Sequence, residues 1–346
     1  MKKFFEINMP YETDPKKLFQ KLSTKKTSDV LHILYNMTDE LYGQRLKNQK
    51  AIEEIYKNYL WYIDKKIIDT PENDTKLSLL VKGNIYLRLG QLRSEAFETT
   101  EEEYTHALKC LEIGSRITSY QNTQNSVFTE TALLLSLNLG KYFRNIGKSG
   151  HKNYFQTAID KFSEIKKLLE ERWAREKSKQ VWEVHLWLDV VVNLGRVKEN
   201  FYYDDDFRKN LADTFPEPLI YYGAIADHTA QLLNNDMYSR THTEIISRKY
   251  LPQNAMNQIW DNKIRLITQE EADVSFLKDY FIQALVRTCI VYRKHREYKI
   301  ALDLCELINN IDSENIDIQN NKSVCYRKQG KIREALSLIE PIEYRN

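Results

Sequence analysis

The sequence predicts an all-α protein: a right-handed α-solenoid of helix pairs, preceded by an atypical helical N-terminal region. One observation is that segments 284–308 and 318–342 align on each other at an offset of 34 residues. The other is composition, because the 346 residues include only 10 Gly and 7 Pro, with 42% hydrophobic residues. So few turn residues favour long helices joined by few tight turns.

The 34-residue offset brings residues of the same kind together. The aligned pairs are Cys289 with Ser323, Tyr292 with Tyr326, Arg296 with Gly330, and Ala301 with Ala335. We therefore expect each unit to have a first helix, a tight turn near residue 296 or 330, and a second helix. Small residues would mark the places where helices cross closely, and the tyrosines would fill the space beside them. Lys322, directly before Ser323, is expected to face solvent.

This pattern resembles the tetratricopeptide repeat (TPR) family. In that family a 34-residue unit has a small residue, a Tyr three positions later, a turn Gly, an Ala and then a large apolar residue. The last unit supplies them in the following order: Ser323, Tyr326, Gly330, Ala335 and Ile339. The resemblance implies TPR-like helix pairs whose first helices line a concave surface.

The first 75 residues are predicted to be helical but do not follow the repeat. Asp14 and Pro15 form an N-cap and first-turn pair, and Ser28 can cap the next helix. Terminal units of solenoids are often atypical because they cover the first face of the core. We expect this region at 1–75 and a TPR-like repeat domain at 76–346.

Two earlier units match the pattern with insertions between their helices. One has Gly83 and a turn at Gly90, followed by a second helix containing Ala107. The other has its turn at Gly147 and a second helix containing Ala158. The inserted segments hold roughly a dozen and roughly six residues more than the repeat requires.

The middle of the chain is predicted to be less regular. Residues 181–195 have the pattern of a first helix, and 219–233 that of its partner. Irregular helices, interrupted at Pro252, are expected over about 196–273. The last two regular repeats then occupy about 282–346.

Composition argues against several classes of partner. The 51 Lys and Arg residues nearly balance 49 Asp and Glu residues, whereas proteins that bind nucleic acid or membrane surfaces usually have a basic excess. No apolar segment is long enough to span a bilayer, and the N-terminus lacks the pattern of an export signal. The four cysteines have no CxxC spacing, which suits a reducing compartment. We expect a cytoplasmic protein.

No motif typical of an enzyme is present, whether a phosphate-binding glycine loop, HExxH or GxSxG. We therefore expect neither catalysis, nor a cofactor, nor a metal site. Cys289, Cys305 and Cys325 fall at packing positions. His185 and Asp189 are four residues apart and could begin a metal site, but no third ligand accompanies them. A surface hydrogen bond is the more common role for such a pair.

Polar and basic residues recur along the predicted first helices. The resemblance places the following residues on the concave face as candidate partner-binding residues: Asn84, Arg88, Lys141, Arg144, Arg293, Lys294, Arg327 and Lys328. Arginine can hold a carboxylate through two hydrogen bonds, so an acidic peptide or a chain terminus is a natural ligand. Equally, basic residues at these positions can simply complement the helix dipole at C-terminal ends. The chaperone-tail clamp found in some TPR proteins is not expected, because the position of its Lys is Leu80.

The function expected from these features is a scaffold module that binds a protein or peptide partner in a concave groove. The alternative is a regulatory or sensor domain whose catalytic or effector domain lies beyond residue 346. Leu336 and its apolar neighbours in the last helix motivate a further expectation, either self-association or continuation of the chain through that helix face.

Overall fold

The computed structural model describes nine segments of the chain, together with four isolated residues between 102 and 109. The segments are 15–43, 45–66, 72–93, 126–148, 150–176, 180–200, 215–233, 235–259 and 274–343. In these segments the regular secondary structure is entirely helical and includes no strand, which confirms the predicted all-α class. The chain divides into two compact units, Met1–Asn145 and Ile146–Asn346.

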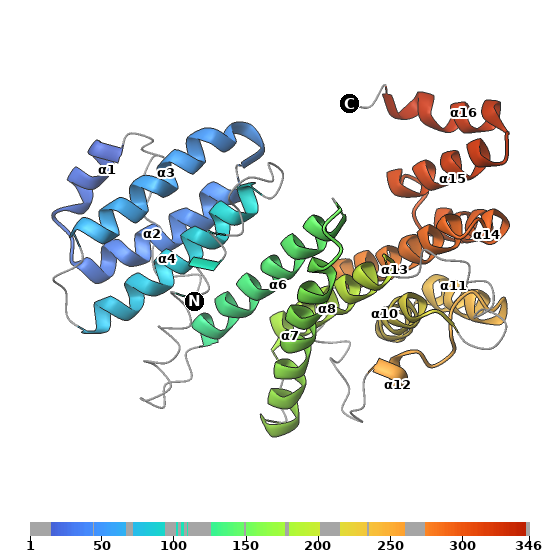
Figure 1. Ribbon diagram of the computed structural model, residues 1–346, viewed down its shortest axis with the longest axis horizontal. Coiled ribbons are helices and arrows are strands. Elements are labelled where there is room, and N and C mark those ends of the chain that lie inside the picture. Colours follow the sequence, from blue (N-terminus) through green and yellow to red (C-terminus); the bar gives the residue numbers. More distant parts are fainter. Residues whose placement is uncertain are drawn as a thin grey trace. The chain divides into compact units, whose positions relative to one another are not determined.

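The first unit contains the N-terminal helices (Figure 1). Their bounds are α1 Pro15–Leu22, α2 Thr27–Gly43, α3 Arg45–Lys66, α4 Glu72–Arg93 and α6 Ser126–Lys148, whose last turn passes into the second unit. Helix α3 packs against α1, α2 and α4, and α4 also packs against α2. The predicted division at residue 75 thus falls in the first turn of a helix that packs on the region before it.

Aromatic residues of α3 form the centre of this unit. Tyr56 and Tyr59 are almost completely buried among aliphatic residues of α2 and α4. A buried tyrosine hydroxyl needs a hydrogen-bond partner, and that of Tyr56 donates to the Thr38 carbonyl oxygen at 2.6 Å. The Thr38 hydroxyl in turn donates to the Leu34 carbonyl at 2.7 Å, so the polar atoms of this core are paired.

Three turns or caps expected in this half of the chain differ in the structure. Helix α2 begins at Thr27, so Ser28 lies within its first turn instead of preceding it. Helix α4 continues through Gly90 to Arg93. Gly147 lies inside α6, and the turn comes at Gly150, where φ is +120°. A Cβ atom at Gly147 would lie 2.5 Å from the Phe155 ring, so this glycine permits close packing. The second helix predicted around Ala107 falls almost entirely outside the described residues.

The second unit holds the remaining helices. Their bounds are α7 Tyr154–Glu176, α8 Val181–Lys198, α10 Glu217–Leu233, α11 Asp236–Ser247, α12 Met256–Ile259, α13 Val274–Lys294, α14 Tyr298–Asn309, α15 Ile316–Lys328 and α16 Ile332–Glu343. Pro252 lies between α11 and α12, where the sequence predicted an interruption. In this unit α7 packs on α8, α8 on α10, and α10 on α13, after which α13–α16 follow one another in chain order (Figure 1). Helix α13 also contacts both α8 and α15.

The core of the second unit is held by large side chains and close helix crossings. Trp173 and Trp187 are fully buried, and their indole N–H groups donate to Glu183 at 2.8 Å and Glu170 at 2.9 Å. Where α8 crosses α10, a Cβ atom at Gly195 would lie 2.7 Å from the Tyr222 ring. Glycine at this position therefore sets how closely the two helices approach.

The turns of the last two helix pairs have the same conformation. Arg296 has φ of +66° and Gly330 has φ of +79°, as the 34-residue offset suggested. After each turn a backbone N–H reaches back five residues to close the end of the first helix. These bonds run from 297 to 292 at 3.0 Å and from 331 to 326 at 2.9 Å. This is a Schellman arrangement, which needs the left-handed conformation that glycine adopts most readily.

The contact between the two helices of each pair is also equivalent. The Cys289 thiol donates to the Ala301 carbonyl at 3.4 Å, and the Ser323 hydroxyl donates to the Ala335 carbonyl at 3.1 Å. Both alanines are buried, as predicted for close crossings. The expectation for Lys322 is wrong, because this side chain is only 8% exposed and its Nζ pairs with Glu306 at 2.8 Å. Its long apolar stem packs in the helix contact while the ammonium group reaches a carboxylate.

Candidate functional site

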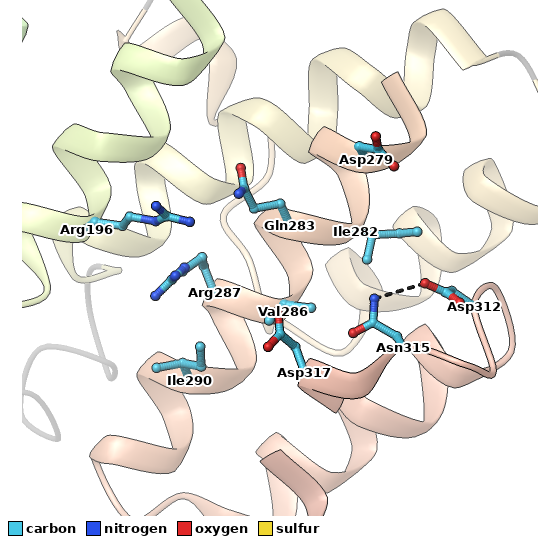
Figure 2. A pocket seen from close by; sticks show the side chains of 10 residues that line it. All are labelled: Arg196, Asp279, Ile282, Gln283, Val286, Arg287, Ile290, Asp312, Asn315 and Asp317. Atoms are coloured by element: carbon cyan, nitrogen blue, oxygen red, sulfur yellow. Dashed lines mark hydrogen bonds between the residues drawn. The ribbon is translucent and has the colours of Figure 1, made fainter. Parts of the chain in front are cut away.

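A pocket of about 240 Å³ lies in the second unit, between α8, α13 and the N-terminal end of α15 (Figure 2). Helix α8 contributes one lining residue, α13 contributes six, and α15 and the loop before it contribute three. The lining residues are Arg196, Asp279, Ile282, Gln283, Val286, Arg287, Ile290, Asp312, Asn315 and Asp317. The pocket is therefore built by three helices that contact one another in the order α8, α13, α15.

Two arginines form one side of this pocket. Arg196 comes from the last turns of α8 and Arg287 from the middle of α13, and both are half-buried. Burial lowers the pKa of Arg196, and the neighbouring positive charge of Arg287 lowers it further. A guanidinium group stays charged in proteins, so the two side chains repel each other across a partly desolvated space. An anion between them would relieve that repulsion.

Two carboxylates, Asp189 and Glu199, act on the charge of Arg196, and both have partners within the chain: Asp189 accepts from the Asn193 amide at 3.0 Å. Glu199 is 5% exposed, accepts a hydrogen bond from the Tyr222 hydroxyl, and pairs with the Lys294 Nζ at 3.1 Å. Burial, reinforced by the charge of Glu199, raises the pKa of Tyr222 and keeps its hydroxyl protonated as a donor. Glu199 thus divides its charge among several groups and does not neutralise the two arginines on its own.

Three aspartates form the other side of the pocket. Asp279 and Asp317 are exposed at its rim, and Asp312 is half-buried in the loop before α15. Asn315 caps α15 by accepting from the Ile318 backbone N–H at 3.2 Å, and its side-chain amide donates to Asp312 at 2.9 Å. The N-cap therefore fixes the position of Asp312 beside the pocket. The whole site is bipolar, with positive charge at the α8 side and negative charge at the rim.

In the first unit, the predicted binding residues largely contact the protein itself. Asn84 is only 2% exposed and donates to Asp39 at 3.2 Å. Arg88 pairs with the same carboxylate at 2.8 Å, and its guanidinium lies 4.7 Å from the centre of the Tyr42 ring. These polar groups tie α4 to α2. Lys141 is half-buried, and the Arg144 Nη2 donates to the neighbouring Asn145 at 3.1 Å.

In the second unit, the predicted binding residues lie outside the pocket lining. Lys294 pairs with Glu199, and Arg293 is half-buried near the end of α13. Arg327 and Lys328 are exposed at the end of α15. The structure thus leaves the last two open to solvent, while Lys294 serves an internal ion pair.

Sequence reasoning missed Arg196 and Arg287, although a signal for the second was present. Asp279, Gln283 and Arg287 are spaced four residues apart, so they share one face of α13. A polar stripe of this kind marks a side of the helix that meets solvent or a polar partner. Arg287 lies in the middle of α13 and not near a helix end, where the binding residues were expected, and Arg196 lies just past the predicted end of its helix at residue 195.

The other chemical candidates resolve as packing contacts. Cys289, Cys305 and Cys325 are buried free thiols, and the first two sulfurs are 3.2 Å apart. The His185 ring stacks on Phe276 with centroids 3.3 Å apart. Across the described segments, no group of three or more His, Cys, Asp or Glu side chains is placed to hold a metal ion. Among the described helices, none has both the length and the apolar character needed to cross a membrane.

Comparison with known proteins gives no relative from which a function could be transferred. No protein-family model matches the chain, and a search of curated proteins finds no significant match. The TPR resemblance therefore stays a prediction from the residues.

Proposed function

We propose that this chain is an interaction module of TPR-like helix pairs, and that it binds a segment of a protein partner in the pocket between α8, α13 and α15. The observation that carries the proposal is the bipolar pocket on three helices that contact one another in turn. In a right-handed solenoid of helix pairs, α8, α13 and α15 would be successive first helices. The pocket would then lie on the concave surface, where helical repeat proteins bind their ligands.

The equivalence of the last two helix pairs supports the repeat. Cys289 and Ser323, 34 residues apart, donate to alanine carbonyls that are also 34 residues apart. The left-handed turn residues Arg296 and Gly330 keep the same spacing. A unit that recurs with its side-chain hydrogen bonds and its turn conformation extends by stacking, and stacking places the first helices side by side.

The chemistry of the pocket favours binding over catalysis. Its polar groups are two guanidinium groups, three carboxylates and two amides, with apolar walls from Ile282, Val286 and Ile290. Among these ten lining residues there is no serine, cysteine, histidine or lysine, and the three aspartates are the only groups that could act as a nucleophile or a general base near neutral pH. Charged donors and acceptors beside an apolar wall are suited to holding the polar ends and the apolar stem of a peptide. The exposed Arg327 and Lys328 would add long-range attraction for an acidic part of the partner.

A selection of peptides tests this function. Random peptides displayed with free C-termini would be selected on the intact chain, and their dissociation constants measured by fluorescence anisotropy. Gln283→Trp should fill the pocket and weaken binding at least tenfold, because the indole occupies the space of the ligand. Lys299→Trp places the same side chain at an exposed position of α14 outside the pocket and should leave binding unchanged.

Two outcomes would overturn the proposal. One is that no peptide is selected above background by a folded protein, judged by its circular dichroism. The other is that the selected peptides bind the Gln283→Trp and Lys299→Trp variants with equal affinity, which would place the binding surface elsewhere on the chain.

A further inference from the structure

Four of the five charges around the pocket are ordered by depth, and the fifth, Asp312, is half-buried on the side opposite the arginines. The guanidinium groups of Arg196 and Arg287 lie at the half-buried side, while the carboxylates of Asp279 and Asp317 lie at the exposed rim (Figure 2). Electrostatic interactions are stronger where water is excluded. An anionic group of a ligand therefore gains most at the arginine side, whereas a cationic group is best placed at the rim, where it keeps part of its hydration.

The arginine side has a donor that the chain does not satisfy. Within the described residues, the Nε atom of Arg196 is buried and has no hydrogen-bond partner. Leaving a buried charged donor unpaired is costly, so an acceptor at this place would be stabilising. Two acidic side chains act on the charge of Arg196: Asp189 accepts from Asn193, and Glu199 accepts from Tyr222 and Lys294. Because the chain encloses this Nε atom, a ligand carboxylate is expected to bind the terminal nitrogens of the same guanidinium group and to offset its charge.

The spacing along α13 sets the length of that ligand. Asp279 and Arg287 are eight residues apart, which corresponds to about 12 Å along the helix axis. In Figure 2 they lie at opposite ends of the pocket lining, with Gln283 between them. This distance along the axis exceeds the separation of charges in a simple amino-acid zwitterion. The carboxylate and the side-chain cation of a C-terminal lysine or arginine can span it.

The volume also favours a single terminal residue. About 240 Å³ lies below the roughly 300–1,000 Å³ of ordinary small-molecule pockets, so one large residue fills it. The lining carries three negative charges against two positive ones. The carboxylates at the rim would repel a segment with several acidic side chains. Of the two ligands expected from the sequence, an acidic peptide and a chain terminus, the pocket therefore favours the terminus, which brings a single carboxylate.

We propose that the pocket binds the C-terminal lysine or arginine of a partner, with the terminal carboxylate between Arg196 and Arg287 and the basic side chain at Asp279, Asp312 and Asp317. The inference rests on the proposed peptide-binding function and names its ligand. The apolar stem of the basic residue lies against Ile282 and Val286, which lie between Asp279 and Arg287 along α13. Each charge of the ligand then has partners of opposite sign, and the terminal carboxylate offsets the charge of the Arg196 guanidinium group.

The test uses small probes that differ by one charge each. Nα-acetyl-lysine carries both the carboxylate and the ammonium group. Its amide lacks the carboxylate, Nα-acetyl-norleucine lacks the ammonium group, and Nα-acetyl-glutamate adds a second carboxylate in its place. Each probe would be titrated into the full chain at low salt while the arginine Nε–H signals are followed by NMR. Acetyl-lysine should bind saturably and at least fivefold more tightly than the other three probes. Acetyl-glutamate should bind more weakly than acetyl-norleucine, because its second carboxylate is repelled by the aspartates at the rim.

Variants assign each end of the probe. Arg287→Gln should remove the advantage of acetyl-lysine over its amide, and Asp279→Asn should reduce its advantage over acetyl-norleucine. Arg287→Lys keeps the charge and should restore part of the binding. Arg333→Gln makes the same change at an exposed position of α16 and should leave every affinity unchanged.

Several results would overturn the ligand assignment. Equal affinity for all four probes would show that the pocket does not read charge. Equal binding of acetyl-Glu-Lys-amide would show that the carboxylate comes from a side chain and not from a terminus. If peptides selected on the chain bind through the pocket but carry no preference for a basic C-terminal residue, the ligand class is wrong while the peptide-binding function stands.

Discussion

Enlarging the alanines at the two equivalent helix crossings should destabilise the second unit. Ala301 is completely buried and Ala335 is 4% exposed, and each contacts its partner helix through a hydrogen-bonded carbonyl. Ala301→Leu and Ala335→Leu add three carbons where two helices already touch. Overpacking of this kind costs about 1–3 kcal/mol of unfolding free energy. Ala301→Leu should be the larger loss, because its helix is packed on α13 and α15, whereas α16 packs on α15.

The assay is thermal unfolding followed by circular dichroism. For a domain of 150–250 residues, 1 kcal/mol shifts the melting temperature by about 2–4 °C, so the expected losses are about 2–12 °C. Arg333→Leu adds the same side chain at an exposed position of α16 and should change the unfolding free energy by less than about 0.5 kcal/mol. Small and equal shifts at all three positions would show that the alanines do not mark close crossings, and the repeat register would then be wrong.

Other predictions follow from single contacts. Asp39→Ala should lower the free energy of unfolding, measured by urea titration, by about 1–3 kcal/mol, because it leaves the buried amide of Asn84 without its acceptor. Asp64→Ala loses one exposed ion pair and should cost under about 1 kcal/mol in the same titration. Cys325, whose pKa burial raises to about 12, should resist iodoacetamide in the native chain and react in urea, as peptide mapping by mass spectrometry would show; labelling at equal rates would contradict this. Burial, and to a smaller extent the charge of Lys294, lower the pKa of His295 from 6.5 to about 4. As the pH drops from 6.5 to 4, the unfolded state therefore binds a proton at this histidine before the folded state does. The free energy of unfolding should fall by about 1–2 kcal/mol over this range, after allowance for solvent screening. His295→Gln should flatten that part of the pH profile, and an unchanged slope would contradict the assignment.

Local sequence patterns predicted the fold well at positions where a single packing or backbone requirement determines the residue type. The alanine spacing and the position of the turn identified the last two helix pairs, because a close crossing and a left-handed turn each admit few residues. Turns assigned from glycine alone were less reliable. Gly90 lies inside α4, and Gly147 serves a close contact with Phe155 within α6. A glycine can permit either a turn or a close approach, and one sequence does not distinguish them.

The candidate site was less accessible from sequence than the fold. A basic residue near the end of a helix can bind a ligand, complement the helix dipole or pair with a carboxylate of the same chain. Arg88 and Lys294 have the last of these roles, with Asp39 and Glu199. Such pairs join residues far apart in sequence, so the spacing within one helix carries no trace of them. The pocket likewise depends on a contact between α8, which carries Arg196, and α13, two helices that are far apart in sequence.

A crystal structure of the full chain with a selected peptide tests the central claim most directly. We predict that the peptide ends in the pocket between α8, α13 and α15, with its terminal carboxylate within hydrogen-bond distance of Arg196 and Arg287. A basic terminal side chain should lie beside Asp279. A peptide bound to the first unit, or on α16 with the pocket empty, would contradict the proposed function.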